Sequence, residues 1–210
     1  MTQFSLTEID ALAAKAARGA GYSWGMAEEA GIATRWLQAK GLPGTTLLLA
    51  HLANMGGTNW PTIAPQIHAN TWTTATGTPL CPLATGATLC DHAALITLPL
   101  TFTSIATPAL LLPFAASLSK ILATPLRLTS PSGHAILNGD DLWLDTPQNW
   151  PTAPLTLTQT TRPTTPPYSA AIQPIPQTTL TALTALALRT TVPPSAQSRA
   201  SAGATGSDND

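Results

Sequence analysis

The chain has 210 residues and nearly balanced charge, with 9 Lys and Arg against 10 Asp and Glu. This balance gives neither a basic surface for a phosphate backbone nor an acidic surface for basic partners, so we expect no nucleic acid partner. Charged residues make up only 9% of the chain, and 35 Thr and 20 Pro replace them on a neutral polar surface.

Neither the start of the chain nor its most apolar stretch predicts export or a membrane partner. Residues 1–10 carry two acidic side chains and lack the basic start and apolar core of a secretory signal. Three prolines interrupt the apolar stretch 92–121 well short of the roughly 20 apolar residues that a membrane helix needs. We therefore expect a soluble, cytoplasmic protein in which Cys81 and Cys90 stay reduced.

The N-terminal part of the chain predicts a helical hairpin followed by a short third helix. Residues 5–8 have the spacing of a capping box, and the apolar periodicity after them predicts a helix that ends within residues 19–21. Ser23 has the position of an N-cap for a second helix that runs to Lys40. A short third helix is expected over residues 47–53.

The middle of the chain begins with a segment in which no regular pattern is visible. Residues 59–91 contain four prolines and are predicted to be a long irregular segment. The alternation of apolar and polar residues over 98–103 predicts the first strand. Pro113 suits the first turn of a helix that continues to Ile121.

The last part of the chain predicts short strands and one more helix. Strands are expected at residues 126–129, 135–137, 142–144 and 155–158, separated by turn residues, and a final helix over 179–189. The predicted fold class is therefore α+β, with an N-terminal helical hairpin packed against a small, mainly antiparallel sheet and a C-terminal helix. Residues 1–194 are expected to form a single α+β domain, and residues 195–210 a Ser/Ala/Gly-rich C-terminal tail.

Two short motifs have structural interpretations that we prefer to catalytic or metal-binding ones. Residues 21–25 fit the G-x-S-x-G pattern of a serine hydrolase, but a helix precedes Ser23 where that motif needs a strand, so Ser23 is interpreted as a helix cap. The spacing of the two cysteines is not that of a compact zinc site, even if a histidine such as His51, His68 or His92 joined them. We therefore predict no metal.

Both ends of the sequence resemble a known family. The opening SLTEIDALAAKAARGAGYSWGMAEEA, the close RTTVPPSAQSRASAGATGSDND and the internal block 81–87 resemble an uncharacterised proteobacterial family of the domain-of-unknown-function kind. The resemblance implies a soluble bacterial protein. Because the family has no established activity, it implies no catalytic residue and no cofactor.

Charged residues are concentrated near the ends of the chain. Residues 8–40 hold eight of them, whereas residues 41–119 hold only Asp91. The candidate binding residues are therefore Arg18, Glu28, Glu29, Arg35, Arg189 and Arg199. We expect a noncatalytic accessory or ligand-binding protein with a protein partner or a small ligand. The alternative is a small enzyme whose site is formed by the N-terminal helices and the C-terminal tail.

Overall fold

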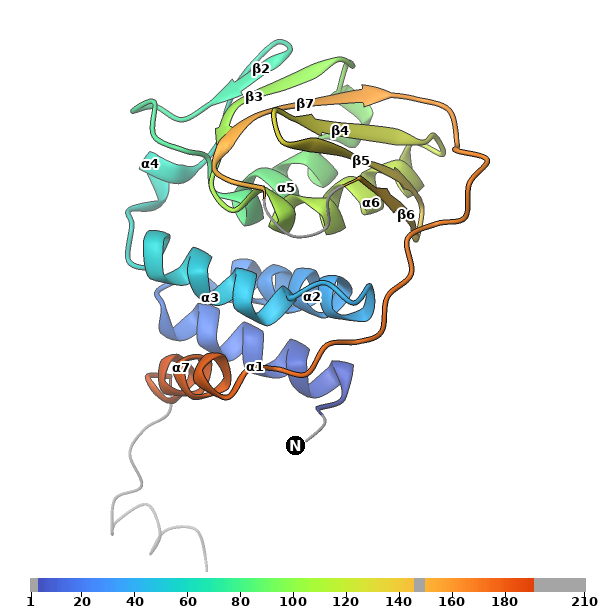
Figure 1. Cartoon of the computed structure of the whole chain (residues 1–210). Helices are drawn as coiled ribbons and strands as arrows, with labels where there is room; N and C mark the ends of the chain where they lie inside the picture. The colour runs from blue at the N-terminus through green and yellow to red at the C-terminus, as the bar shows by residue number, and fades with distance from the viewer. Residues whose placement is uncertain (1–3, 146–149, 191–210) are drawn as a thin grey trace, which may run out of the picture.

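The computed structural model describes residues 4–145 and 150–190. In the view of Figure 1, a curved seven-stranded sheet lies above two helices, and a further group of helices lies below those two. Helices and strands thus occupy separate layers, which is the α+β class that the sequence predicts. The predicted N-terminal hairpin and C-terminal helix are both present.

The group of helices below consists of α1 (Leu6–Gly19), α2 (Trp24–Ala39), α3 (Gly44–Met55) and α7 (Gln177–Leu188). The capping box at the start of α1 is confirmed, because Ser5 Oγ accepts a hydrogen bond from the Glu8 N–H and Glu8 Oε2 accepts one from the Ser5 N–H. The interpretation of Ser23 as a cap is also confirmed, since its Oγ accepts from the Met26 N–H in the first turn of α2.

Small residues allow α1 to pack closely against its neighbours. Ala13, Ala16 and Ala17 are fully buried in one apolar cluster with alanines of α2. At the end of α1, a Cβ added to Gly19 would lie 1.8 Å from the backbone oxygen of Leu186 in α7. Glycine is therefore what permits the two helices to approach at this point.

The seven strands are β1 (Gln66–His68), β2 (Thr71–Thr73), β3 (Leu100–Ile105), β4 (Leu126–Ser130), β5 (Gly133–Asn138), β6 (Asp141–Leu144) and β7 (Ala153–Gln159). Their order in the sheet is β1-β2-β3-β7-β4-β5-β6, and all neighbours are antiparallel except β2 and β3, which are parallel. The mainly antiparallel sheet is confirmed, with the last strand of the sequence, β7, inserted between β3 and β4.

The core forms where alternate strand residues face α5 (Pro82–Asp91) and α6 (Leu112–Ile121). Phe102 of β3, Leu128 of β4 and Leu157 of β7 are fully buried in one cluster. Two short 3₁₀ segments, η1 (Ala93–Leu95) and η2 (Pro108–Leu111), follow α5 and precede α6. Within the described residues, no helix combines the length and the apolar character that crossing a membrane requires.

The prediction that residues 59–91 are irregular is wrong. This segment contains α4 (Trp60–Ile63), the hairpin of β1 and β2, and all of α5. Pro82 begins α5 because the first helical position needs no N–H donor. The strand predicted first is consequently the third in the chain, and the third helix starts at Gly44 instead of residue 47.

An extended connection joins the sheet to the group of helices below it. After β7 the chain runs along one side of the molecule to α7 (Figure 1). Backbone and side-chain bonds hold it, with the Trp143 indole N–H donating to the Thr165 carbonyl at 2.8 Å and the Gln38 side-chain amide donating to the Gln173 carbonyl at 2.6 Å. The connection that leads to α7 is therefore bonded both to the sheet and to α2. The tail predicted at 195–210 lies outside the described residues.

Candidate functional site

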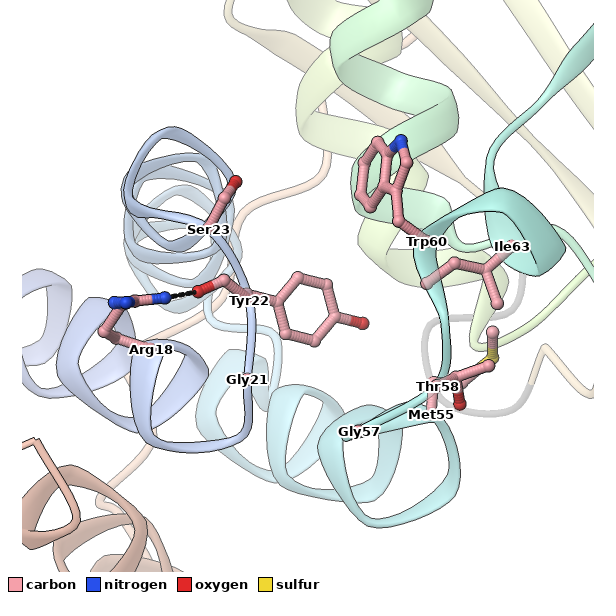
Figure 2. A pocket seen from close by; sticks show the side chains of 9 residues that line it. All are labelled: Arg18, Gly21, Tyr22, Ser23, Met55, Gly57, Thr58, Trp60 and Ile63. Atoms are coloured by element: carbon pink, nitrogen blue, oxygen red, sulfur yellow. Dashed lines mark hydrogen bonds between the residues drawn. The ribbon is translucent and has the colours of Figure 1, made fainter.

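A pocket of about 400 Å³ lies between the turn from α1 to α2 and the segment from α3 to α4 (Figure 2). We call it the Arg18–Trp60 pocket. Its lining residues are Arg18, Gly21, Tyr22, Ser23, Met55, Gly57, Thr58, Trp60 and Ile63. Its volume falls within the range of roughly 300–1,000 Å³ that is typical of sites for small molecules.

Two glycine-containing turns shape the pocket and are bonded to each other. Gly21 has a φ of 101° and Gly57 a φ of 76°, which are conformations that other residues rarely adopt. The Gly57 N–H donates to the Ala20 carbonyl at 3.0 Å, so the end of α1 and the end of α3 are joined directly. The two walls of the pocket are therefore held at a fixed spacing.

The polar side of the pocket is positively charged. The Arg18 guanidinium donates through Nη1 to the Tyr22 carbonyl and lies 5.1 Å from the centre of the Trp24 ring. Ser23 places the N-terminus of α2, with its positive end of the helix dipole, at the same wall. None of the described lining residues is acidic, so the pocket favours an anionic group.

The opposite side of the pocket is apolar. Figure 2 shows the Tyr22 ring reaching from the α1–α2 turn toward Ile63 and Met55, with the Trp60 ring on the far wall. Trp60 is 44% exposed, which is unusual for so large an apolar side chain. Aromatic rings on both sides suit a flat or apolar ligand body.

Directly beneath Tyr22 lie two further polar side chains, and we call the three residues the Tyr22–His51–Cys81 cluster. The Tyr22 hydroxyl is 2.8 Å from His51 Nε2 and 3.6 Å from Cys81 Sγ, and that sulfur is 3.5 Å from the same Nε2. His51 comes from α3 and Cys81 is the N-cap residue of α5. The cluster thus joins the turn, α3 and α5 under the floor of the pocket.

Burial keeps the cluster uncharged. His51 and Cys81 are fully buried, and Tyr22 is 6% exposed. Burial lowers the pKa of His51 to about 4 and raises the pKa values of the Cys81 thiol and the Tyr22 hydroxyl. At neutral pH the three groups are therefore a neutral imidazole, a thiol and a phenol.

One nitrogen of the cluster is left without a partner among the described residues. Nδ1 of His51 is buried and makes no hydrogen bond there. If the proton sits on Nδ1, a buried donor is unpaired, and if it sits on Nε2, a buried acceptor is unpaired. Either tautomer costs about 1–3 kcal/mol relative to a paired group.

One family model matches residues 4–81, the part of the chain that contains the Arg18–Trp60 pocket. Over these residues the chain is similar to the family described as a protein of unknown function (DUF3726). The predicted resemblance to a family of unknown function is confirmed over residues 4–81, and the match includes the whole Arg18–Trp60 pocket and all three residues of the cluster. Searches of curated proteins and of solved structures each gave no match.

The structure brings two of the predicted binding residues together at a second pocket. Arg18 and Glu28 both line a cavity of about 310 Å³ between α1, α2 and the end of α7. We call it the Lys15–Thr190 pocket, and its other lining residues are Ala11, Ala14, Lys15, Trp24, Ala27 and Thr190. Arg18 therefore stands between two cavities and belongs to both.

The remaining predicted residues that the structure describes do not line the Arg18–Trp60 pocket. Arg35 Nε is 3.5 Å from Asp10 Oδ2 in an exposed ion pair between α1 and α2. Glu29 is half-buried, and its burial, together with the charges of Asp91 and Glu28, raises the pKa of its carboxyl. Arg189 caps the end of α7, and Arg199 lies outside the described residues.

The cluster could not be predicted from the sequence, because its members are about thirty residues apart and lie in three separate segments. Cys81 and Cys90, for which no disulfide is predicted, are both free in the structure. His92, which was considered as a metal ligand, instead lies with Nδ1 3.0 Å from the Thr88 carbonyl at the end of α5. A signal that could have pointed to Cys81 is its place before Pro82, which marks it as a helix N-cap.

Proposed function

We propose that this protein binds a small organic anion in the Arg18–Trp60 pocket. The observation that carries the proposal is the pairing, in one cavity, of the Arg18 guanidinium with aromatic walls and no acidic side chain among the described lining residues. An apolar pocket with a few convergent polar groups is the usual form of a small-molecule site.

The charge of Arg18 supplies the selectivity for an anion. Its guanidinium now donates to a neutral carbonyl, that of Tyr22. A carboxylate is a stronger acceptor, and hydrogen bonds to charged groups contribute about 1.5–3 kcal/mol against about 1 kcal/mol for neutral ones. Packing of a flat ligand against Tyr22 or Trp60 adds roughly 0.5–1.5 kcal/mol.

Phenylacetate and its neutral amide, phenylacetamide, test this proposal by titration calorimetry. We expect phenylacetate to bind at least about tenfold more tightly, which corresponds to about 1.4 kcal/mol. Arg18→Gln should remove this preference. Arg162→Gln is the matched control, because Arg162 also lies over a tryptophan ring, 5.7 Å from the centre of Trp143, but is far from the pocket.

Equal affinities for the two compounds in the wild-type protein would contradict the proposal. So would a preference for phenylacetate that survives Arg18→Gln, because the anion would then be recognised elsewhere. Arg18→Lys keeps the positive charge and loses the planar fork of donors, so its affinity for phenylacetate separates the contribution of charge from that of paired hydrogen bonds.

We also propose that the protein is a bacterial cytoplasmic one. The two free cysteines support this location, because thiols stay reduced in the cytosol. The balanced net charge of −1 supports a small ligand or a protein over nucleic acid as the partner.

A small enzyme is the second candidate function. The specific observation that favours it is the Tyr22–His51–Cys81 cluster, which places a thiol and an imidazole directly behind one wall of the Arg18–Trp60 pocket. Helices α1 and α2 contribute to this site through Arg18, Ser23 and the turn between them.

A further inference from the structure

We propose that Cys81 is the nucleophile of an acyl-transfer site, with His51 as its base and Tyr22 as the side chain that closes the site. The substrate class is a carboxylic ester or thioester that carries an anionic group. This inference rests on the proposed function, because the Arg18–Trp60 pocket must bind the anionic group and present the acyl carbon to Cys81.

The position of Cys81 suits a nucleophile. Its Sγ lies 3.5 Å from His51 Nε2, within the distance over which a thiol can transfer its proton. Cys81 is also the N-cap residue of the ten-residue helix α5, where the helix dipole stabilises a thiolate. Burial raises the pKa of the Cys81 thiol, whereas the nearby backbone N–H groups of Ala84 and Leu83 and the Tyr22 hydroxyl act to lower it.

Tyr22 separates this pair from the Arg18–Trp60 pocket. It is a lining residue of the pocket, and its hydroxyl contacts both His51 and Cys81 on the other side. Cys81 and His51 are themselves fully buried. Rotation of the Tyr22 side chain would therefore remove the hydroxyl from Nε2 and Sγ and open them to the pocket together.

Arg18 couples ligand binding to this opening. Its guanidinium donates to the backbone carbonyl of Tyr22 and so holds the residue that closes the site. An anion that binds Arg18 competes with that carbonyl, because the carboxylate is the stronger acceptor. Tyr22 also sits between Gly21, with its φ of 101°, and the start of α2, so it belongs to a short turn and not to a helix.

The unpaired nitrogen of His51 points to a functional role for the cluster. A purely structural site could hold an apolar side chain here and avoid a buried polar atom without a partner. Buried polar atoms that lack a partner are rare in folded proteins, and catalysis is one of the recognised reasons for them. In the tautomer with the proton on Nδ1, Nε2 is the nitrogen that faces Cys81 Sγ and can accept its proton.

The reaction balances with water as the second reactant. His51 Nε2 takes the proton from Cys81 Sγ, which forms a bond to the acyl carbon while the bond to the leaving oxygen or sulfur breaks, and the leaving group takes the proton from His51. A water molecule then gives a proton to Nε2 and attacks the acyl carbon. The bond between the acyl carbon and Sγ breaks, the carboxylic acid is released and the proton on Nε2 returns to Sγ, so the net reaction is hydrolysis.

The test uses the full chain and the half ester of glutaric acid with 4-nitrophenol, which carries a free carboxylate. We expect the glutaryl group on Cys81 of the wild-type protein, detected by mass spectrometry of its peptides, with Cys90 unmodified. His51→Gln should slow the acylation by about 100-fold or more, the usual contribution of a general base. 4-Nitrophenyl acetate, which lacks the carboxylate, should acylate Cys81 more slowly than the half ester.

A matched pair of variants tests the closing role of Tyr22 with iodoacetamide as the probe. Tyr22→Ala removes the side chain and should raise the alkylation rate of Cys81, whereas Tyr22→Phe keeps the ring and should leave it low. The alkylation rate of Cys90 is the internal reference for loosening elsewhere in the protein, because this thiol is half-buried and lies outside the cluster. Acceleration at both cysteines alike would count against the closing role.

The inference is wrong if the half ester acylates Cys81 of the wild-type protein only at the rate of global unfolding. It is also wrong if His51→Gln leaves the rate of Cys81 acylation unchanged. If phenylacetate still binds with Arg18 dependence in that case, the proposed function stands and only the nucleophile is refuted. If Cys81 is acylated through His51 but phenylacetate and phenylacetamide bind equally, the nucleophile stands and the anion selectivity is wrong.

Discussion

Acidification should destabilise this protein through His51. The side chain is fully buried in α3, and burial lowers its pKa from 6.5 to about 4. The unfolded chain, in which His51 is solvated, therefore binds a proton at a higher pH than the folded protein does. Stability that depends on neutral His51 is complete above pH 6.5 and is lost as the pH falls toward 4.

The size of this effect follows from the pKa difference. The interval from 6.5 to about 4 corresponds to about 3 kcal/mol, at about 1.4 kcal/mol for each pKa unit. That is a large part of the roughly 5–15 kcal/mol by which folded domains are stable. Glu29 acts in the opposite direction, because its raised pKa makes protonation at low pH favourable to the folded state.

Urea unfolding at a series of pH values between 7 and 4 measures the effect, with His51→Gln as the test variant. The free energy of unfolding of the wild-type protein should fall by about 3 kcal/mol more than that of the variant, so that the two curves converge at acid pH. His68→Gln, on exposed β1, is the control and should follow the wild type. Parallel curves for wild type and His51→Gln would refute the reasoning, because other groups would then account for the acid sensitivity.

Three other predictions concern the helices and thiols. Gly19→Ala should cost about 1–3 kcal/mol, because its Cβ would meet the backbone of α7, whereas Gly25→Ala, with open space around it, should be neutral or slightly stabilising in thermal unfolding. Ser23→Ala should cost about 1 kcal/mol of unfolding free energy and a fluorophosphonate should leave Ser23 unlabelled, since it is a helix cap; stoichiometric labelling would disprove this. Without reductant, a thiol reagent should find Cys81 and Cys90 both reactive after denaturation, and none reactive would contradict the free thiols.

Local signals in the sequence were sufficient to predict those helices and strands whose ends are marked by residues within or next to the element itself. The capping box at Ser5, the cap at Ser23 and the early proline of α6 each predicted a helix that is present. The strands from 126 onward were predicted because apolar residues and turn residues alternate within a few positions.

The segment 59–91 was mispredicted because its structure depends on distant partners. β1 and β2 have three residues each, too few to show a period, and β2 becomes part of the sheet by pairing with β3 about thirty residues later. The prolines suggested a break, but Pro82 starts a helix. The central place of β7 is likewise set by pairing with β3 and β4, which no local pattern reveals.

The candidate site was predictable only in its charged part. The concentration of charge near the N-terminus pointed to Arg18, which lines both pockets. Arg35 belongs to the same run of charges, but it pairs with Asp10. The sequence offers His51 and Cys81 only as possible metal ligands and Cys81 as a helix N-cap, whereas their joint chemistry comes from burial and from contact with Tyr22 across three segments.

Amide chemical shifts measured by NMR during a titration with phenylacetate test the central claim, which is that the Arg18–Trp60 pocket binds small organic anions. The resonances of Gly21, Ser23, Gly57 and Thr58 should shift with one common dissociation constant, and those of the distant sheet should not. In Arg18→Gln the same shifts should be much weaker at equal ligand concentration. Shifts centred on the Lys15–Thr190 pocket, or no shifts at saturating phenylacetate, would contradict the account.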